Sequence, residues 1–232
     1  WHFTEVTAEA GAAISTYYSH GAAAADFDND GLLDLFVACE RQTNRLYHNL
    51  GDGKFEEVSR LAGVQQDAKA FCKGGIWLDY DNDDFPDLFL NNLEGSGRLY
   101  HNNRNGTFTD VSDTLGIDGP REGFPCWAWD YDNDGWLDIF ATSYFRSVEA
   151  IVKGMLGEPV DYRSNRLFRN QQGQGFEDRT QAAGLDLVLG TMGCNYGDFD
   201  NDGWLDMYLG TGAPGYEFLV PNRMFKNVGG QR

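Results

Sequence analysis

Four short segments of the chain carry aspartates at a spacing that suits a divalent cation. In the segment Asp130 to Asp138, DYDNDGWLD, acidic side chains stand at positions 1, 3, 5 and 9, and Gly135 stands at position 6, where the backbone must turn sharply. Oxygen ligands at alternate positions suit Ca²⁺, which accepts six to eight oxygens in flexible geometry. They suit Mg²⁺ less well, because Mg²⁺ demands near-octahedral geometry. Related segments begin at Asp26, Asp79 and Asp198. The sequence therefore predicts about four calcium sites.

The segments that flank each loop have the composition of strands. An EF-hand opens in the same way but needs a Glu at position 12 between two helices, whereas position 12 here is apolar in every copy. Short apolar runs such as WLDIFAT follow the loops, and runs such as GGIWLDY precede them. Aromatic and branched residues in such runs favour strands. Each loop is therefore expected to join two paired strands.

A second motif follows the first three loops. The segment Asn44 to Val64, NRLYHNLGDGKFEEVSRLAGV, recurs at residues 97–117 and 165–185 and has the pattern of a β-hairpin with a glycine-bearing turn. One repeat thus contains four strands. The loops recur at intervals of about 50 residues, with a longer third interval, and four-stranded units at such a period are typical of β-propeller blades. We expect repeat units at about 20–64, 70–117, 124–185 and 192–232.

These motifs together resemble the FG-GAP/VCBS repeats of integrin-α-like calcium-binding propellers. The hairpins, and TMGCNYGDFDNDGWLDMYLGTGAPGYEFLVPNRMFKN near the end, are similar to the cartilage-acidic-protein and ASPIC/UnbV group of that superfamily. The resemblance covers nearly the whole chain and implies an all-β propeller of four-stranded blades. Carried over by motif position, it also implies that each loop binds Ca²⁺ through four aspartates and the backbone carbonyl at position 7. These residues are Asp26, Asp28, Asp30, Leu32, Asp34; Asp79, Asp81, Asp83, Phe85, Asp87; Asp130, Asp132, Asp134, Trp136, Asp138; and Asp198, Asp200, Asp202, Trp204, Asp206.

The second loop departs from the pattern. Asp84 replaces the glycine at position 6, and Pro86 stands at position 8. Asp adopts left-handed backbone geometry less freely than Gly. We therefore expect the second loop to be the most distorted or the weakest site.

The two ends of the chain complement each other. Residues 1–11 match the last strand of a hairpin without its partner, and residues 222–232 match the strand and turn that precede it. Pairing them would complete a fourth blade, within one molecule as a closed ring or between molecules head to tail. Residue 1 is Trp, with neither an initiator Met nor a leader pattern. The resemblance implies further repeats and an ASPIC/UnbV domain, so an excerpted or self-assembling chain is favoured over a closed ring.

Composition restricts the partners and the compartment. The chain has 232 residues, 36 acidic and 18 basic, and a formal net charge of -18, which argues against nucleic acid as a partner. No apolar run reaches membrane-spanning length. Calcium loops of extracellular modules need roughly 10⁻⁴ to 10⁻³ M Ca²⁺, which favours a secreted or cell-surface protein.

Four cysteines permit two disulfides without requiring any. Cys126 and Cys194 each lie four residues before the first aspartate of a loop. These matched positions favour a small buried space in the repeat over a disulfide bond.

No catalytic motif stands out. The sequence has no G-x-S-x-G, C-x-x-C or H-E-x-x-H pattern. His48 and His101 share one slot with Arg169 and Lys226, which is expected to be an exposed strand position. We expect a non-catalytic scaffold for adhesion, ligand binding or self-assembly. The alternative, by resemblance, is a carbohydrate-binding or polysaccharide-cleaving calcium-dependent propeller.

A binding face is expected on the side of the variable loops. In an up-and-down blade the calcium loops and the tight turns emerge on one face, and the loops of variable length emerge on the other, where recognition usually occurs. The longest such loop, residues 143–164, contains apolar residues at helical spacing. The candidate ligand-binding residues, for a protein or glycan ligand, are Tyr144, Phe145, Met155, Tyr216 and Phe218.

Overall fold

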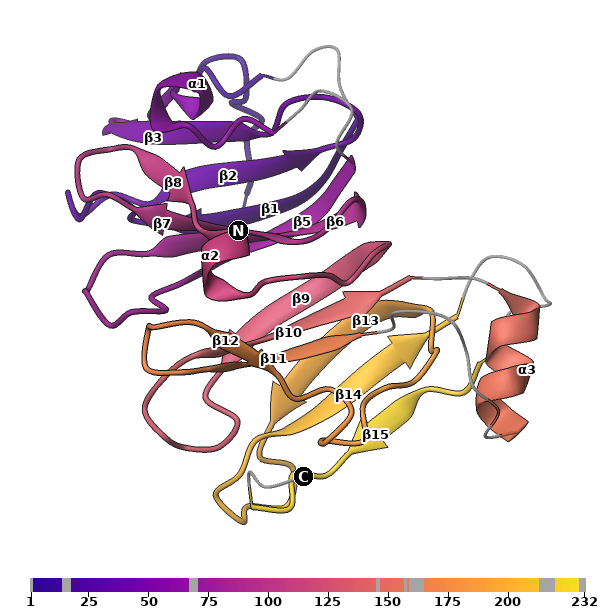
Figure 1. The fold of residues 1–232 in the computed structure, drawn as a ribbon. Helices are drawn as coiled ribbons and strands as arrows, with labels where there is room; N and C mark the ends of the chain where they lie inside the picture. Colours follow the sequence, from indigo (N-terminus) through magenta and orange to yellow (C-terminus); the bar gives the residue numbers. More distant parts are fainter. Residues whose placement is uncertain are drawn as a thin grey trace.

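The chain folds into a row of four small antiparallel sheets (Figure 1). The computed structural model describes residues 2–13, 18–66, 71–144, 147–156, 158, 165–212 and 220–229. The first three sheets have four strands and the last has three. The strands are β1 Ser19–Ala25, β2 Asp34–Cys39, β3 Arg45–Gly51, β4 Lys54–Glu57; β5 Phe71–Leu78, β6 Asp87–Glu94, β7 Arg98–Asn102, β8 Phe108–Asp110; β9 Gly123–Trp129, β10 Asp138–Ser143, β11 Arg166–Asn170, β12 Phe176–Asp178; and β13 Thr191–Gly197, β14 Asp206–Thr211, β15 Arg223–Phe225.

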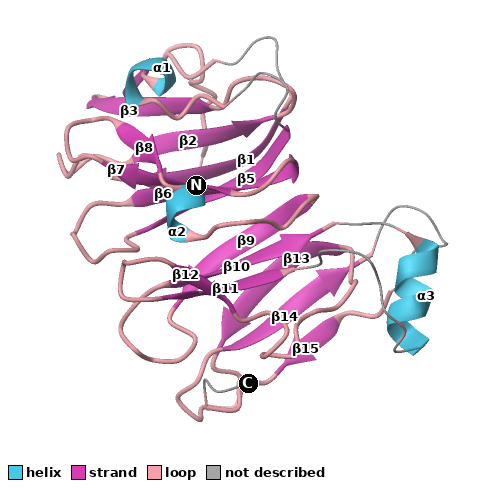
Figure 2. Ribbon diagram, viewed as in Figure 1, coloured by secondary structure: helices cyan, strands magenta, loops and turns pink. Residues whose placement is uncertain are grey.

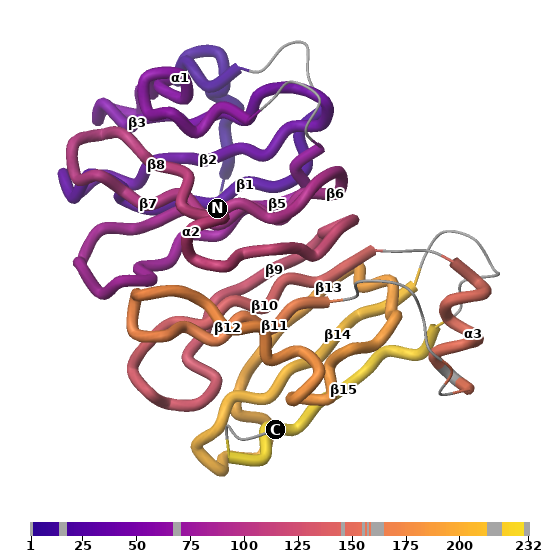
Figure 3. Tube along the Cα trace, in the orientation of Figure 1, coloured from indigo at the N-terminus to yellow at the C-terminus, as the bar shows by residue number. Residues whose placement is uncertain are grey.

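Each sheet is an up-and-down meander in which neighbouring strands follow one another along the chain. Successive sheets meet through their first strands, because β1 contacts β5, β5 contacts β9 and β9 contacts β13. Strands dominate the structure (Figure 2). The trace runs from the first sheet at one end of the row to the fourth at the other, and the described residues form no closed ring (Figure 3). The expected all-β architecture of propeller-type blades is therefore confirmed.

Apolar side chains fill the space between successive blades. Phe36, Phe89 and Phe140 occupy the same position in the second strand of the first three blades, and all three are fully buried. At the first interface Phe27, from the first aspartate loop, packs against Phe108 of the second blade with ring centroids 5.8 Å apart. Burial of such a side chain contributes about 1.5–3 kcal/mol. The core thus joins each blade to the next and ties the loops to that interface.

Short helices that the sequence did not predict connect the blades. In α1 (Ser59–Ala62) the Glu57 carboxylate accepts the Ser59 N–H at 3.0 Å, and Gly63 ends the helix at φ 79°. A Cβ on Gly63 would lie 3.1 Å from the Phe108 carbonyl oxygen, so that both conformation and space favour glycine there. The connector α2 (Ser112–Leu115) repeats this arrangement. A single helical turn is too short to show apolar periodicity in the sequence.

The predicted helix in the longest loop is present as α3 (Val148–Leu156). None of the helices in the described ranges is long and apolar enough to cross a membrane.

The N-terminal residues lie beside the first blade. The Phe55 N–H donates to the Ala10 carbonyl oxygen at 2.8 Å, and Gly11 contacts the Phe55 backbone, so this segment takes the place that α1 takes beside the second blade. Residues 2–13 form no strand, and the side chain of Phe3 is 93% exposed. Their pairing with the fourth blade is therefore not formed within this molecule, and it stays a prediction for contacts between molecules.

Candidate metal sites

The four aspartate loops share one framework of hydrogen bonds. In the third loop the Asp130 carboxylate accepts the N–H groups of Asp134 and Gly135 at 3.0 and 2.8 Å. The Asp138 carboxylate accepts the N–H of Tyr131 at 3.1 Å and so joins the two ends of the loop. The other three loops repeat these bonds with lengths between 2.8 and 3.2 Å. The spacing of the aspartates therefore folds each loop even before a cation is considered.

The second loop is not distorted, contrary to expectation. Asp84 adopts φ 70° at the position where the other loops have glycine at about 90°, and its N–H still donates to Asp79 at 2.8 Å. Asp is one of the residues that tolerate left-handed geometry. The weaker calcium binding expected of this loop stays a prediction.

The carboxylates at positions 1, 3 and 9 converge in the first three loops. One oxygen from each lies within 4.8 Å of the others in three sets: Asp26, Asp28, Asp34; Asp79, Asp81, Asp87; and Asp130, Asp132, Asp138. The position-3 oxygen Oδ1 is buried in all three loops, and within the described part of the chain no donor reaches it. A buried acceptor without a partner costs about 1–3 kcal/mol. The donor set thus fits a hard cation that would supply the missing partner.

Burial raises the pKa of the position-9 carboxyl groups. Asp87 and Asp138 are fully buried, and desolvation raises the pKa of Asp87 to about 8 and of Asp138 to about 7. The backbone N–H groups that donate to these carboxylates act in the opposite direction but do not offset burial. In the absence of a cation these two groups therefore hold protons near neutral pH, and a cation would compete with those protons.

A pH-dependent stability follows for protein stripped of metal. Between about pH 4 and pH 8 the folded state binds more protons than the unfolded state, because Asp87 and Asp138 titrate later when folded. The free energy of unfolding should therefore fall as the pH rises through this range. Calorimetry without metal should give a higher unfolding temperature at pH 5.5 than at pH 8. The variant Asp138→Asn should show a smaller difference, and a higher stability at pH 8 in both proteins would contradict the prediction.

Histidines lie beside the first two loops, which the sequence did not predict. His48 Nδ1 lies 3.1 Å from Asp34 Oδ1 and 3.5 Å from Asp28 Oδ2. His101 occupies the same place in the second blade. The expectation of an exposed strand position is therefore wrong for the first three blades, where His48, His101 and Arg169 are half-buried beside their loops, whereas Lys226 of the fourth blade is exposed as expected.

Permanent cations hold the same slot in the last two blades. Arg169 Nε lies 2.5 Å from Asp132 Oδ2, and its Nη2 lies 2.9 Å from Asp134 Oδ2. Lys226 contacts both Asp200 and Asp202. The hydrogen bond from Arg169 to Asp132 holds the pKa of the guanidinium above its usual range. These side chains partly neutralise the carboxylates that the loops would offer to a cation.

An asparagine after this slot fastens each blade to the one before it. Asn170 Nδ2 donates to the Tyr80 carbonyl oxygen of the second loop at 2.8 Å and to the Leu137 carbonyl oxygen of its own loop at 3.0 Å. Its N–H donates to Asp138 at 2.7 Å. Asn102 and Asn227 repeat all three bonds. The hairpin motif contained this asparagine in every copy, but its reach to the neighbouring blade depends on tertiary packing.

The loops also contact one another directly. The position-4 asparagine of each of the first three loops donates to the position-6 carbonyl oxygen of the next loop, as Asn82 does to Gly135 at 3.2 Å. The loops and the blade interfaces are therefore one connected structure.

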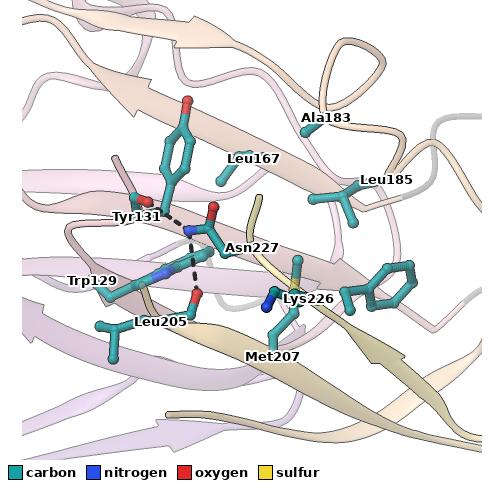
Figure 4. A pocket seen from close by; sticks show the side chains of 10 residues that line it. Trp129, Tyr131, Leu167, Ala183, Leu185, Leu205, Met207, Lys226 and Asn227 are labelled. Atoms are coloured by element: carbon teal, nitrogen blue, oxygen red, sulfur yellow. Dashed lines mark hydrogen bonds between the residues drawn. The ribbon is translucent and has the colours of Figure 1, made fainter. Parts of the chain in front are cut away.

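A small apolar cavity lies where the third blade meets the fourth (Figure 4). It has a volume of about 70 Å³, is partly open to solvent, and is lined by residues that include Tyr131, Leu185 and Phe225. By repeat position, Tyr131 corresponds to Phe27 and Tyr80, which pack against phenylalanines of the last strand of the following blade. The described part of the fourth blade has no such strand. The cavity thus lies where an aromatic side chain of a last strand packs at the other two interfaces.

The predicted ligand-binding residues are only partly placed. Tyr144 stacks on Phe124 with ring centroids 5.0 Å apart. Met155 belongs to α3, but its side chain lies outside the described part of the structure. Phe145, Tyr216 and Phe218 lie outside the described residues. All four cysteines are free, with Cys126 and Cys194 only partly accessible, which agrees with the preference for a small slot over a bond.

Comparisons with known proteins agree with this geometry. Residues 26–71, 79–141 and 155–209 match the family model described as FG-GAP-like repeat. The chain is 28% identical over 223 residues to cartilage acidic protein 1 of Homo sapiens, covering 90% of this chain and 30% of that protein. It is 29% identical over 218 residues to the Mus musculus protein, covering 90% and 31%. The chain therefore spans about a third of the length of the curated relatives it matches.

Proposed function

The chain belongs to the FG-GAP-like repeat family, and from that premise we propose that it is an extracellular, calcium-binding β-propeller scaffold. One observation carries the proposal. The position-3 carboxylate of three loops holds a buried oxygen that no donor in the described residues reaches, at the point where two further carboxylates converge. Repetition of the same donor set in separate blades argues against a chance acidic turn.

The residues that would hold calcium are the sixteen aspartates already named, with the position-7 carbonyls as further ligands. When bound, Ca²⁺ supplies positive charge among carboxylates that otherwise repel one another, by roughly 1 kcal/mol per pair at 4 Å in water and about 4 kcal/mol at an effective dielectric of 20. The backbone of the same loops accepts the asparagine bonds of the following blade. Calcium binding would therefore stabilise the blade interfaces as well as the loops.

We propose a non-catalytic role in adhesion, ligand binding or self-assembly. The family match and the similarity to cartilage acidic protein 1 support a scaffold rather than an enzyme. The rigid loops occupy one face, which leaves the opposite face for a protein or glycan ligand.

Self-assembly has a defined contact in this proposal. The N-terminal segment FTEV matches the last strand of each blade, and Phe3 corresponds to Phe108 and Phe176, which pack at the two complete interfaces. Phe3 of one molecule would fill the cavity beside Tyr131 of another (Figure 4). Light scattering after size-exclusion chromatography should show concentration-dependent dimers or longer chains. Phe3→Ser should leave a monomer, whereas the exposed control Leu61→Ser should not, and a wild-type monomer at high concentration would contradict this contact.

The side chain at the repeat position of His48, His101, Arg169 and Lys226 should set the cation affinity of the loop beside it. Replacing Arg169 by Met removes the charge that contacts Asp132 and Asp134, and should strengthen cation binding to the third loop by about three- to tenfold. Terbium luminescence in a Trp204→Leu background is a suitable measurement, because Trp136 is then the one tryptophan within an aspartate loop that can sensitise the ion. The control Arg179→Met removes a cation that pairs with Glu177 outside the loops. Equal terbium affinities in Arg169→Met and wild type would show that the slot does not regulate the loop.

A further inference from the structure

A polar pocket of about 350 Å³ lies between the first and second blades, at the end of the strands away from the aspartate loops. Its walls are the β6–β7 turn, which follows Glu94, and the connector after α1, which contributes Gln65 and Gln66. Arg98, Tyr100 and Asp110 line the rest. The volume is within the range of small-molecule sites.

Two buried polar atoms at this pocket have no partner in the described structure. Asn92 is 4% exposed, and its Nδ2 donates to the Ser96 carbonyl oxygen at 2.9 Å, but its Oδ1 accepts no hydrogen bond. Gln66 Oε1 lies 3.5 Å from Asn44 Nδ2, but its buried Nε2 has no hydrogen bond of normal geometry, although the amide lies near the Tyr100 hydroxyl. The pocket therefore presents one unused acceptor on Asn92 and one donor on Gln66 without a hydrogen bond of normal geometry, and both atoms gain from a ligand that meets them.

The corresponding corner of the third blade is filled. There Ser143, which corresponds to Asn92, donates through Oγ to the Arg121 carbonyl oxygen of the connector at 3.2 Å. The Arg166 side chain, which corresponds to Arg98, is 11% exposed, whereas that of Arg98 is 38% exposed. The open corner with unmet polar atoms is thus absent from the third blade and does not follow from the repeat alone.

The chemistry of the walls selects the ligand. The walls carry donors on Gln66 and Arg98 and acceptors on Asn92, Asp110 and Glu94, and a hydroxyl group can serve both kinds because it donates and accepts. Arg98 Nη1 lies 3.5 Å from Asp110 Oδ2, which leaves the walls weakly negative. The chain as a whole has a net charge of -18. An anionic ligand is therefore disfavoured, and a neutral ligand with several neighbouring hydroxyls fits best.

We propose that this pocket binds a neutral sugar, with Gln66 Nε2 donating to one hydroxyl and Asn92 Oδ1 accepting from another. This binding requires none of the aspartate loops as ligands, so it is independent of the calcium proposal. A free sugar and the end of a glycan chain offer the same hydroxyls, and the pocket is open enough for either.

Ligand-observed saturation-transfer NMR on the whole chain with 1 mM calcium tests this assignment. The probes are glucose, galactose, mannose, N-acetylglucosamine, N-acetylgalactosamine and β-linked disaccharides of each. At least one should bind, and Gln66→Met and Asn92→Leu should each weaken it by about tenfold. Gln174→Met, on the exposed β11–β12 turn, should bind as wild type does. Absence of binding by every neutral sugar, or binding unchanged in both pocket variants, would overturn the proposal.

A stability measurement separates sugar binding from a structural role. Gln66→Glu keeps the oxygen that faces Asn44 and replaces the unused donor. It should lose sugar binding while its unfolding temperature without sugar stays within a few degrees of wild type, and Gln66→Met should also stay within a few degrees, because it removes the unused donor together with the long contact to Asn44. A large loss of stability in Gln66→Met without sugar would show instead that the amide supports the fold.

Discussion

Removing calcium from the chain is expected to lower its unfolding temperature by about 10–20 °C. With an assumed Kd of about 10⁻⁴ M and about 10⁻³ M free Ca²⁺, each loop adds roughly 1.4 kcal/mol to the free energy of unfolding, and four independent loops add about 5–6 kcal/mol. In a chain of this size 1 kcal/mol shifts the unfolding temperature by about 2–4 °C. Differential scanning calorimetry with 1 mM Ca²⁺, and again after chelation, measures the shift.

Two controls make that experiment specific. Mg²⁺ at the same concentration should restore little of the lost stability, because it demands octahedral geometry and keeps its waters. Asp132→Asn removes part of a convergent set and should lower the calcium-dependent gain by about a quarter, in proportion to one loop of four. Equal unfolding temperatures with and without calcium would contradict the expectation.

Asn170→Leu is expected to destabilise the calcium-loaded chain by about 3 kcal/mol or more. The substitution leaves the carbonyl oxygens of Tyr80 and Leu137 and the N–H of Gly173 without their partner, at a position between the second and third blades where Asn170 is 1% exposed. Each unmet buried group costs about 1–3 kcal/mol. Urea denaturation at saturating calcium measures the difference in unfolding free energy.

The first blade offers a matched control for that substitution. Asn49 stands at the same repeat position but donates through Nδ2 only to Leu33 of its own loop, at an exposed site, with no bond to another blade in the described structure. Asn49→Leu should therefore cost about 1 kcal/mol. The excess cost of Asn170→Leu measures the bond between blades. Similar losses in the two variants would show that this asparagine acts within its own blade alone.

The repeated pattern in the sequence predicted most of the fold. The alternation of apolar residues within a strand and the recurrence of the loop and hairpin motifs can both be read from the sequence alone. Alternating apolar runs defined the strands, and the aspartate loops and glycine turns defined their connections. The helical spacing around Ile151 located α3. The helices α1 and α2 were missed, since four residues between a carboxylate cap and a left-handed glycine show no apolar period.

The candidate sites were predicted less completely. Three aspartates do converge in each of the first three loops. The repeat position of His48, His101, Arg169 and Lys226, by contrast, was expected to be an exposed strand position. His48, Arg169 and Lys226 share little beyond the capacity for positive charge, and their orientation toward the loop depends on how the second and third strands of a blade pair. The asparagine next to the slot was visible in every hairpin, but its acceptor lies in the preceding blade. Neither contact follows from spacing along the chain.

The stoichiometry of calcium binding tests the central claim most directly. Isothermal titration of calcium into chelator-stripped protein at pH 7.5 should give four ions per chain, with loss of one ion in Asp132→Asn. Protons should be released on binding, because Asp87 and Asp138 carry raised pKa values in the metal-free fold. If the titration gave no heat and no bound calcium at millimolar concentration, the assignment of the aspartate loops as calcium sites would be contradicted.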